Sequence, residues 1–391
     1  MSCRLAPTAS PRLLLFQHVE KTGGTSLREW LKTRAHDTAR FGVVPYTSAA
    51  CFLCRHRELA LCPVPCHKDG PLLRSSIHAS CDLMKSSVAV EFHASIGHAL
   101  VQKMRSHLPE LRRKYAAHNG TLRTLTILRE PVAHMLSVFR MWPPRMPRRP
   151  PAGGEEYIEQ VHRLRAAPLV PFDAWLPLAS GLQCCALTAP FVARMPYGWT
   201  PSPPAEQRGC SPACHQRLAE FDLVGLTSCM PSVYRAVEAA LALPTNTSLD
   251  ALVTVVKAGE RRSRFAEGSA LLAGTTCWSE RALTPPMRAE ARRVARVDRE
   301  LYGAAAARSV PGCAAAPPPA ETAPAAERCA SAEDAPELVR EWRAAIARPW
   351  GEFARAFGLE TTADWMLWEV DELAAKRHAR AELNRNRTRG R

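Results

Sequence analysis

The sequence predicts an α/β protein with a central parallel sheet flanked by helices and a C-terminal helical extension. Short apolar runs that suit buried strands occur at residues 12–18, 87–93 and 122–128, and a segment with helical spacing follows each of them. Strands that alternate with helices in this way favour a parallel sheet covered on both faces. The chain has 391 residues, which is enough for one large core and a smaller additional segment.

The first strand is expected at residues 12–18, directly before the glycine-containing segment 19–26. Leu27, Trp30 and Leu31 come next, with the i, i+3, i+4 spacing of one helix face. This part of the chain is therefore predicted to be a strand, a glycine loop and a helix.

An irregular, cysteine-rich insertion is expected at residues 42–86, which contain Pro, Gly and five cysteines without a clear period. The cysteine cluster at residues 51–66, followed by His67, suits either disulfides or a tetrahedral zinc site. Disulfides are the first interpretation and zinc the second, and free thiols in a loose insertion are a third. Cys210 and Cys214 form another closely spaced pair.

Two further strands are expected at residues 87–93 and 122–128, and each leads into a segment with helical spacing. Arg129 closes the later strand, and Pro131 suits the first turn of the following helix. Residues 142–154 are rich in proline and glycine and are predicted to form a loop, which three arginines make basic.

The second half of the chain continues the same alternation. Residues 221–226 are predicted to form a fourth strand, with a helix after it at about residues 232–243. Thr284 and Pro285 have the residue types of a helix start, and they predict a long helix that extends to Tyr302.

The organisation predicted for the whole chain has three parts. Residues 12–303 are expected to form the main domain. Residues 304–332 are rich in Ala and Pro and are predicted to be a linker. Residues 333–391 are expected to form a helical C-terminal segment with a basic tail.

The charge balance indicates a partner that is an anion. Lys and Arg total 52 against 37 Asp and Glu, so the net charge is +15, which attracts nucleotides, acidic glycans or membrane lipids. The sequence contains no basic motif with interleaved aromatics that is typical of a nucleic-acid module, so nucleic acid is not an expected partner. It also contains no run of about 18 apolar residues, so membrane association would require an anchor outside this sequence.

The glycine loop after the first strand has the composition of a phosphate cradle. Glycines let backbone amides approach an anion without an intervening Cβ, and a helix N-terminus adds N–H donors and a partial positive charge. Lys21 precedes the glycines, whereas the lysine of a Walker A loop follows them, so the order argues against an NTPase. The alternative is a glycine-rich turn with Lys21 in solvent. The predicted phosphate-binding residues are Lys21, Thr22, Gly23, Gly24, Thr25 and Ser26.

A second anion-binding position is predicted at Arg129. An arginine at the carboxyl end of a parallel strand faces the crevice where α/β sheets bind ligands. Ser137 lies about two helical turns further on, so its hydroxyl could complete an arginine–phosphate contact. The alternative is an ion pair between Arg129 and Glu130, with Ser137 facing water.

These two segments resemble the cofactor motifs of the PAPS-dependent sulfotransferases of the Golgi carbohydrate type, where PAPS is 3′-phosphoadenosine 5′-phosphosulfate. Residues 18–26 resemble the 5′-phosphosulfate loop of that family, and residues 126–131 with Ser137 resemble its 3′-phosphate motif at the expected spacing. Residues 221–227 and 298–302 are similar to later segments of the family.

The sequence also departs from the family pattern. Glu20 stands where the family usually has Pro, and Ser228 with Cys229 replaces a common Glu-Arg pair. The resemblance covers roughly residues 12–303 in the same order and leaves out the insertion at 42–86.

The resemblance implies a P-loop-like sulfotransferase fold and PAPS as the co-substrate, with no metal required. The sulfuryl group would pass to a hydroxyl acceptor, which is expected to be a carbohydrate, with an anionic glycan as one candidate. Residence in the Golgi lumen or association with its membrane follows from the same resemblance.

The catalytic base implied by this reaction is His93 or Glu91. The two residues are two apart on a predicted strand, so their side chains share one face. A neutral imidazole suits removal of the acceptor proton, and family members often carry His or Glu at this position. We expect His93 to be the base, with Glu91 orienting it or replacing it and Lys21 stabilising the leaving phosphate oxygen. The alternative is that one of the two pairs with a nearby Arg or Lys and is structural.

Two other functions are compatible with the sequence. A nucleotide-dependent phosphotransferase would need Walker order and a Mg²⁺-binding carboxylate after a strand, and neither is evident. A non-catalytic binding protein on the same fold is the second alternative, and the presence of Lys21, Arg129, Ser137 and His93 argues against it.

Overall fold

The structure is a computed structural model that divides into two compact units. The first unit comprises residues 1–144 and 169–336, and the second comprises 145–168 and 337–391. The structure describes the following residues: 8, 10–38, 40–44, 87–93, 98–141, 168–188, 210–244, 280–313, 329 and 331–346.

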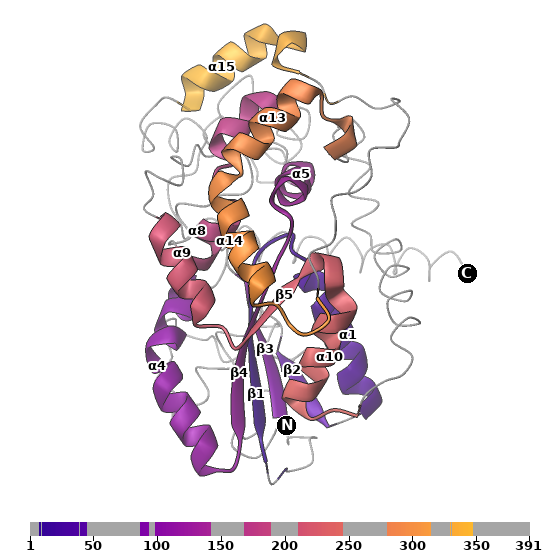
Figure 1. Ribbon diagram of the computed structural model, residues 1–391, viewed down its shortest axis with the longest axis vertical. Helices are drawn as coiled ribbons and strands as arrows, with labels where there is room; N and C mark the ends of the chain where they lie inside the picture. The colour runs from indigo at the N-terminus through magenta and orange to yellow at the C-terminus, as the bar shows by residue number, and fades with distance from the viewer. Residues whose placement is uncertain are drawn as a thin grey trace, which may run out of the picture. The chain divides into compact units, whose positions relative to one another are not determined.

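The first unit is built on a sheet of five parallel strands in the order β2-β3-β1-β4-β5 (Figure 1). The strands are β1 (Arg12–His18), β2 (Phe41–Val44), β3 (Ser87–His93), β4 (Thr121–Leu128) and β5 (Leu223–Leu226). The predicted α/β class with a central parallel sheet is confirmed.

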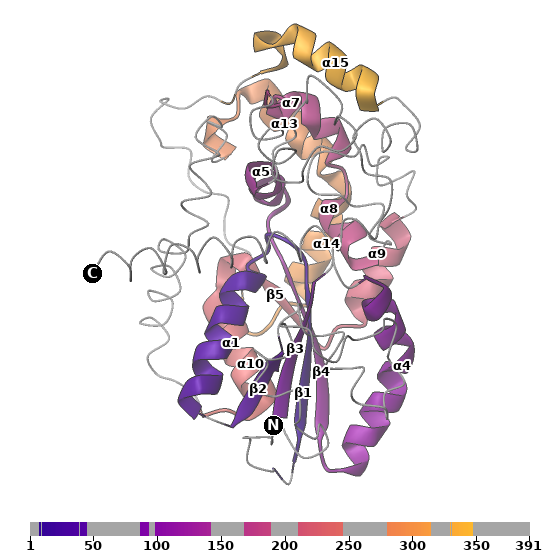
Figure 2. The same cartoon turned by 180° about the vertical axis from the view of Figure 1, so that it is seen from behind.

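Helices cover both faces of this sheet. Figure 1 and Figure 2 show α1 and α10 on one face and α4 and α9 on the other. The helices and short 3-10 turns of the first unit are α1 (Gly24–Thr38), α4 (His98–Ala117), α5 (Pro131–Met141), α7 (Phe172–Trp175), η2 (Leu176–Leu178), α8 (Leu182–Thr188), α9 (Cys210–Ala219), η4 (Thr227–Cys229), α10 (Met230–Leu241), η6 (Glu280–Ala282), α13 (Pro285–Val294), α14 (Arg296–Ala307) and η7 (Ala332–Asp334). The described residues of the second unit are 168 and 337–346, and the latter belong to α15 (Pro336–Ile346).

The pleat of β1 divides its side chains between the two covered faces. Leu14 and Phe16 are buried in the core that contains Trp30 of α1 and Tyr234 of α10, whose rings stack with centroids 4.7 Å apart. Gln17 points to the opposite face, where its amide donates to the carbonyl of Ala186 in α8 at 3.3 Å. Because side chains alternate along a strand, His18 lies on the same face as Phe16.

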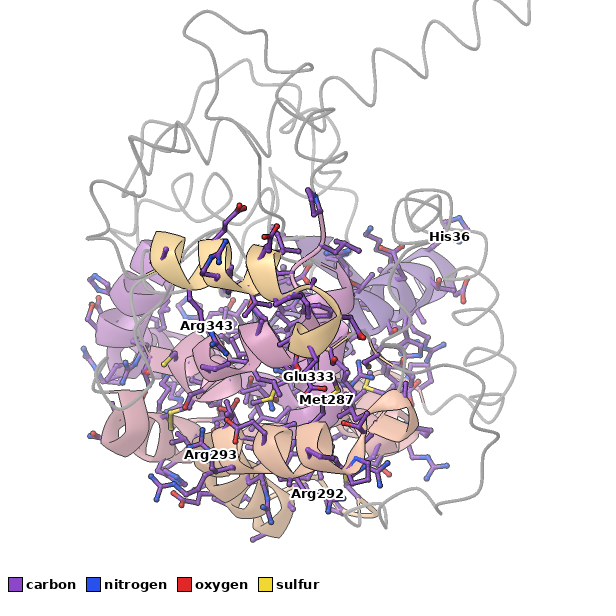
Figure 3. All side chains as sticks on the ribbon, turned by 90° about the horizontal axis from the view of Figure 1, so that it is seen from above. His36, Met287, Arg292, Arg293, Glu333 and Arg343 are labelled. Carbon is purple, nitrogen blue, oxygen red and sulfur yellow. A yellow bond between two sulfur atoms is a disulfide. The ribbon has the colours of Figure 1, made fainter. Side chains whose placement is uncertain are left out.

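A second apolar cluster joins α5 to α7 and α13. Phe139 packs edge to face against Phe172 at 5.1 Å, and Met287 of α13 is buried in the same cluster. Figure 3 shows Met287 on the inner side of α13, whereas Arg292 and Arg293 extend outward from it. The cluster fixes α5, the helix that follows β4, at the carboxyl end of the strands.

Three elements differ from the sequence expectations. Residues 42–44 were expected to belong to the irregular insertion, but they form most of β2, which pairs in parallel with β3. The long helix expected from Pro285 is interrupted at Ala295, where ψ is near 1°, so that α13 and α14 are separate helices. Finally, α14 continues to Ala307, past the expected start of the linker.

Disulfides in which both cysteines are described include two that join elements distant in sequence, which confirms the expectation of disulfide bonding. Cys184 of α8 is bonded to Cys214 of α9, with Cα atoms 5.1 Å apart. Cys229 of η4 is bonded to Cys313 after α14, with Cα atoms 5.3 Å apart. The cysteine cluster at residues 51–66 lies outside the described residues, so its disulfide or zinc chemistry stays a prediction.

Among the described residues, no helix has the length and apolarity needed to span a bilayer. The same residues contain no cluster of three or more His, Cys, Asp or Glu side chains that could bind a metal ion.

Candidate functional site

The candidate site lies at the carboxyl edge of the sheet, where the predicted glycine loop and Arg129 come together. The connection from β1 leads through α1 to β2 on one side of the sheet, and the connection from β4 leads to β5 on the other side. Adjacent strands whose connections diverge in this way leave a crevice between their carboxyl ends, which is the usual ligand position in open α/β sheets.

The glycine loop is a tight turn between β1 and α1. The Thr22 hydroxyl donates to the carbonyl of Val19 at 2.8 Å, and Lys21 and Gly23 both have positive φ angles, of 63° and 93°. A left-handed conformation is costly for a lysine, and strain of this kind concentrates at functional positions. The side chain of Lys21 is half-buried, which disagrees with the alternative of a fully solvated lysine.

The N-terminus of α1 opens directly from this loop. The amide of Leu27 makes the first bond of the helix, to the carbonyl of Gly23 at 3.1 Å. The preceding amides of Gly24 and Thr25 therefore have no acceptor within the helix. Thr25 is exposed and Ser26 is half-buried, so the first turn of α1 has the features of an anion-binding helix end.

Gly24 is required by a close contact with His18. A Cβ on Gly24 would overlap three atoms of the His18 imidazole ring. The absence of a side chain therefore lets the first turn of α1 lie directly on a buried ring from the end of β1.

Arg129 is fixed through its own backbone. Its amide donates to the side-chain oxygen of Gln183 at 2.8 Å, and its carbonyl accepts from the side-chain nitrogen of Gln183 at 2.8 Å. Asp298 in turn accepts from the amides of Gln183 at 3.1 Å and Cys184 at 2.9 Å, which satisfies the start of α8. A buried residue of α14 therefore supports the turn after β4 through one intermediate side chain.

The Arg129 side chain contacts the glycine loop. Its guanidinium donates to the carbonyl of Lys21 at 3.3 Å. Glu130, the ion-pair partner considered for Arg129, caps α5 by accepting from the amides of Val132 at 3.2 Å and Ala133 at 2.6 Å. Ser137 lies further along α5 and is half-buried.

A buried charged network lies beside the loop, on the α1 face of the sheet. Oε1 of Glu91 is 2.7 Å from Nδ1 of His18, and Nη1 of Arg28 on α1 donates to both Glu91 oxygens at 3.3 Å. The side chains of His18 and Glu91 are 4% and 3% exposed, so their hydrogen bonds are made with protein groups and not with bulk water. The contacts described for Glu91 are therefore to His18 and Arg28, an arrangement that corresponds to the structural alternative considered for this residue.

His93 is the register partner of His18 across β3 and β1. The two residues therefore lie next to each other on adjacent strands. The side chain of His93 lies outside the described set, so its role as a base stays a prediction.

His134 of α5 lies beneath the loop and is 2% exposed. Its Nε2 donates to the carbonyl of Glu20 at 2.8 Å, which requires the proton to be on that nitrogen. Burial lowers the pKa of His134 from 6.5 to about 4, and the nearby positive charges of Arg129 and Lys21 act in the same direction. The ring is therefore neutral at neutral pH and serves as a hydrogen-bond donor.

The sequence reasoning identified the loop and Arg129 but missed several of the side chains that surround them: Arg28, His134, Gln183, Thr227 and Asp298. Thr227 and His134 carried a usable signal, because both follow closely on the carboxyl end of a parallel strand. Gln183 and Arg28 carried none, because their contacts depend on how α8 and α1 pack.

No model of a known protein family matches this chain, and the search of curated proteins found no match.

Proposed function

We propose that this protein transfers a sulfuryl group from PAPS to a hydroxyl of a carbohydrate. The observation that carries the proposal is the contact between the two anion-binding motifs, in which the guanidinium of Arg129 donates to the carbonyl of Lys21 at 3.3 Å. Two cationic positions this close, at the ends of adjacent strands, suit a single donor with phosphate groups at both ends.

In this proposal the donor lies across the carboxyl edge of the sheet. Lys21 and the first-turn amides of α1 hold the 5′-phosphosulfate, with Thr25 and Ser26 as further donors. Arg129 and Ser137 hold the 3′-phosphate. Positive charge and backbone amides directed at a phosphate are sufficient to bind and polarise it without a metal ion.

The reaction forms one bond and breaks one. The acceptor oxygen attacks sulfur, the bond between sulfur and the 5′-phosphate oxygen breaks, and adenosine 3′,5′-bisphosphate leaves. The acceptor proton passes to His93, or to Glu91 in its place, and Lys21 stabilises the charge that develops on the leaving oxygen.

An oxidising compartment such as the Golgi lumen fits the two disulfides, because such bonds persist there and not in the cytosol. The net charge of +15 favours an anionic glycan as the acceptor. The basic arginine loop expected at residues 142–154 would add to this preference, and it lies outside the described residues.

Nucleotide binding tests the donor first. Calorimetry with PAPS, adenosine 3′,5′-bisphosphate and ATP should show a clear preference for the two 3′-phosphorylated ligands over ATP. A preference for ATP with Mg²⁺ would instead support a phosphotransferase and would overturn the proposal.

Transfer of label from ³⁵S-PAPS to a panel of desulfated glycans tests the reaction itself. The variant His93→Ala should lower turnover by about 10²- to 10⁴-fold, because a general base contributes on that order, and it should leave PAPS affinity unchanged. Tight PAPS binding without any transfer would show a non-catalytic binding protein.

A further inference from the structure

Three consecutive carbonyls of the glycine loop each accept a hydrogen bond from a side chain outside the loop. The carbonyl of Glu20 accepts from His134 Nε2 at 2.8 Å, and that of Lys21 accepts from Arg129 Nη1 at 3.3 Å. The carbonyl of Thr22 accepts from Thr227 Oγ1 at 2.7 Å. The donors come from α5, from the end of β4 and from η4.

This pattern fixes the orientation of the loop amides. A trans peptide is planar, so its N–H points away from its C=O. Once the carbonyls of Lys21 and Thr22 are held toward Arg129 and Thr227, the amides of Thr22 and Gly23 must point the other way. The Thr22 amide turns back to Val19 at 3.4 Å, and the Gly23 amide begins the run that continues into the first turn of α1.

The Thr227 hydroxyl also connects the two motifs. The same oxygen lies 3.2 Å from the carbonyl of Leu128, the residue before Arg129. A single side chain thus lies between the loop that follows β1 and the turn that follows β4. Its hydroxyl can shift its proton between the two carbonyls, so a small displacement of either loop is opposed by both.

We propose that His134 and Thr227 are positioning residues for PAPS. Their side chains hold the glycine loop so that its amides face the 5′-phosphosulfate. The inference rests on the proposed function, and neither residue is expected to contact PAPS itself. His134 acts as a neutral, buried donor to Glu20, and Thr227 acts through Thr22 and Leu128.

A purely structural role makes a different prediction from a positioning role. If the two side chains only satisfied buried carbonyls, their loss would lower the stability of the whole fold and affect all ligands alike. If they aim the loop amides, their loss should weaken ligands that carry a 5′-phosphate and spare ligands that carry only a 3′-phosphate.

The experiment compares variants that remove the side-chain hydrogen-bond donor with variants that keep one. Thr227→Val and His134→Phe remove a donor at similar size, whereas Thr227→Ser and His134→Gln retain one. Thr38→Val is the matched control, because the Thr38 hydroxyl also donates to a carbonyl, that of Arg34 at 2.8 Å, at the far end of α1.

Affinities are measured by calorimetry for adenosine 3′,5′-bisphosphate, adenosine 5′-monophosphate and adenosine 3′-monophosphate. Thr227→Val and His134→Phe should weaken the two 5′-phosphorylated ligands by about 5- to 10-fold each, which corresponds to one net hydrogen bond. Thr227→Ser and His134→Gln should stay within about twofold of wild type, as should Thr38→Val, and the 3′-monophosphate should be unaffected throughout.

Hydrogen–deuterium exchange of residues 20–26 without nucleotide gives a second readout. Thr227→Val should accelerate exchange in this loop about 5-fold or more relative to Thr227→Ser, because the free energy of local opening falls by one hydrogen bond. Unchanged loop exchange, or equal weakening of the 3′- and 5′-monophosphates, would overturn the positioning role. If the wild-type protein binds none of the nucleotides, the proposed function itself is wrong. The positioning role of His134 and Thr227 toward PAPS is then wrong as well.

Discussion

The glycine loop after β1 and the Arg129 turn after β4 lie at the same edge of the sheet, yet they are held in different ways. The loop is fixed through its carbonyls by side chains from α5, β4 and η4. The turn is fixed through its own amide and carbonyl by Gln183, and the helix after it is capped by the adjacent Glu130. The glycine loop therefore takes its geometry from residues more than a hundred positions away as well as from its glycines.

Acidification should weaken the hold on the glycine loop, because His134, one of the three side chains that donate to its carbonyls, is a titratable group. The pKa of His134 is about 4 in the folded protein and about 6.5 when unfolded, so the unfolded state binds the proton more readily. The stabilisation is therefore complete above pH 6.5 and is lost as the pH falls toward 4, a loss of about 3 kcal/mol.

Chemical denaturation between pH 7 and 4 measures this loss, and His134→Gln provides the comparison. The variant should show a shallower fall in unfolding free energy over that interval. Parallel curves for wild type and variant would contradict the assigned cause.

Arg129→Ala tests the turn after β4, and it should lower the affinity for a nucleotide that carries a 3′-phosphate. Loss of a charged hydrogen bond costs about 1.5–3 kcal/mol, so adenosine 3′,5′-bisphosphate should bind about 10- to 150-fold more weakly, as measured by calorimetry. Arg129→Lys keeps the charge without the planar fork and should lie between wild type and Arg129→Ala. Equal weakening of adenosine 5′-monophosphate would mean that Arg129 acts mainly through the Lys21 carbonyl.

Gly24→Ala tests how closely the loop packs on β1. The new Cβ would overlap the buried His18 ring, so we expect a loss of about 1–3 kcal/mol in unfolding free energy, measured by chemical denaturation. Gly303→Ala is the control, because a Cβ there meets no atom within 4 Å, and in the interior of α14 it should be neutral or stabilising by up to about 1 kcal/mol. Similar losses at both positions would show that the His18 contact is not responsible.

The smallest expected effect concerns the backbone of Lys21. Its φ of 63° favours glycine, so Lys21→Gly should be about 1 kcal/mol more stable than Lys21→Ala, while both lose donor affinity. Asn119, with φ 54°, offers the same comparison away from the site, where Gly in place of Ala should stabilise without changing donor affinity. Thermal unfolding of the four variants measures the two differences.

Local signals explain why much of the fold could be predicted from the sequence. β1, the glycine loop and the start of α1 follow directly from an apolar run, a pair of glycines and apolar spacing, and β4 with Arg129 follows in the same way. β2 could not be predicted, because four residues that include Gly42 give no measurable period. The interruption at Ala295 likewise has no breaker residue in the sequence.

Residues of the candidate site could be predicted only where an adjacent sequence pattern marks them. Lys21 and Arg129 each stand at the end of a recognisable strand. The partners of Glu91 could not be predicted, because Arg28 reaches it only when α1 packs on the sheet, and His18 meets it only when β1 pairs with β3. Thr227 likewise acquires its role only when β5 joins the sheet beside β4.

The bond between Cys229 and Cys313 has a consequence for how this site is assembled in the cell. Cys229 lies two residues after Thr227, and its partner is 84 residues further along the chain. During synthesis the glycine loop, β4 and Thr227 all emerge well before that partner does. The disulfide that joins η4 to the segment after α14 can therefore form only after the ribosome has made most of the first unit. Until then the turn that contains Thr227 is held by noncovalent contacts alone, including the hydrogen bonds of Thr227 to Thr22 and Leu128.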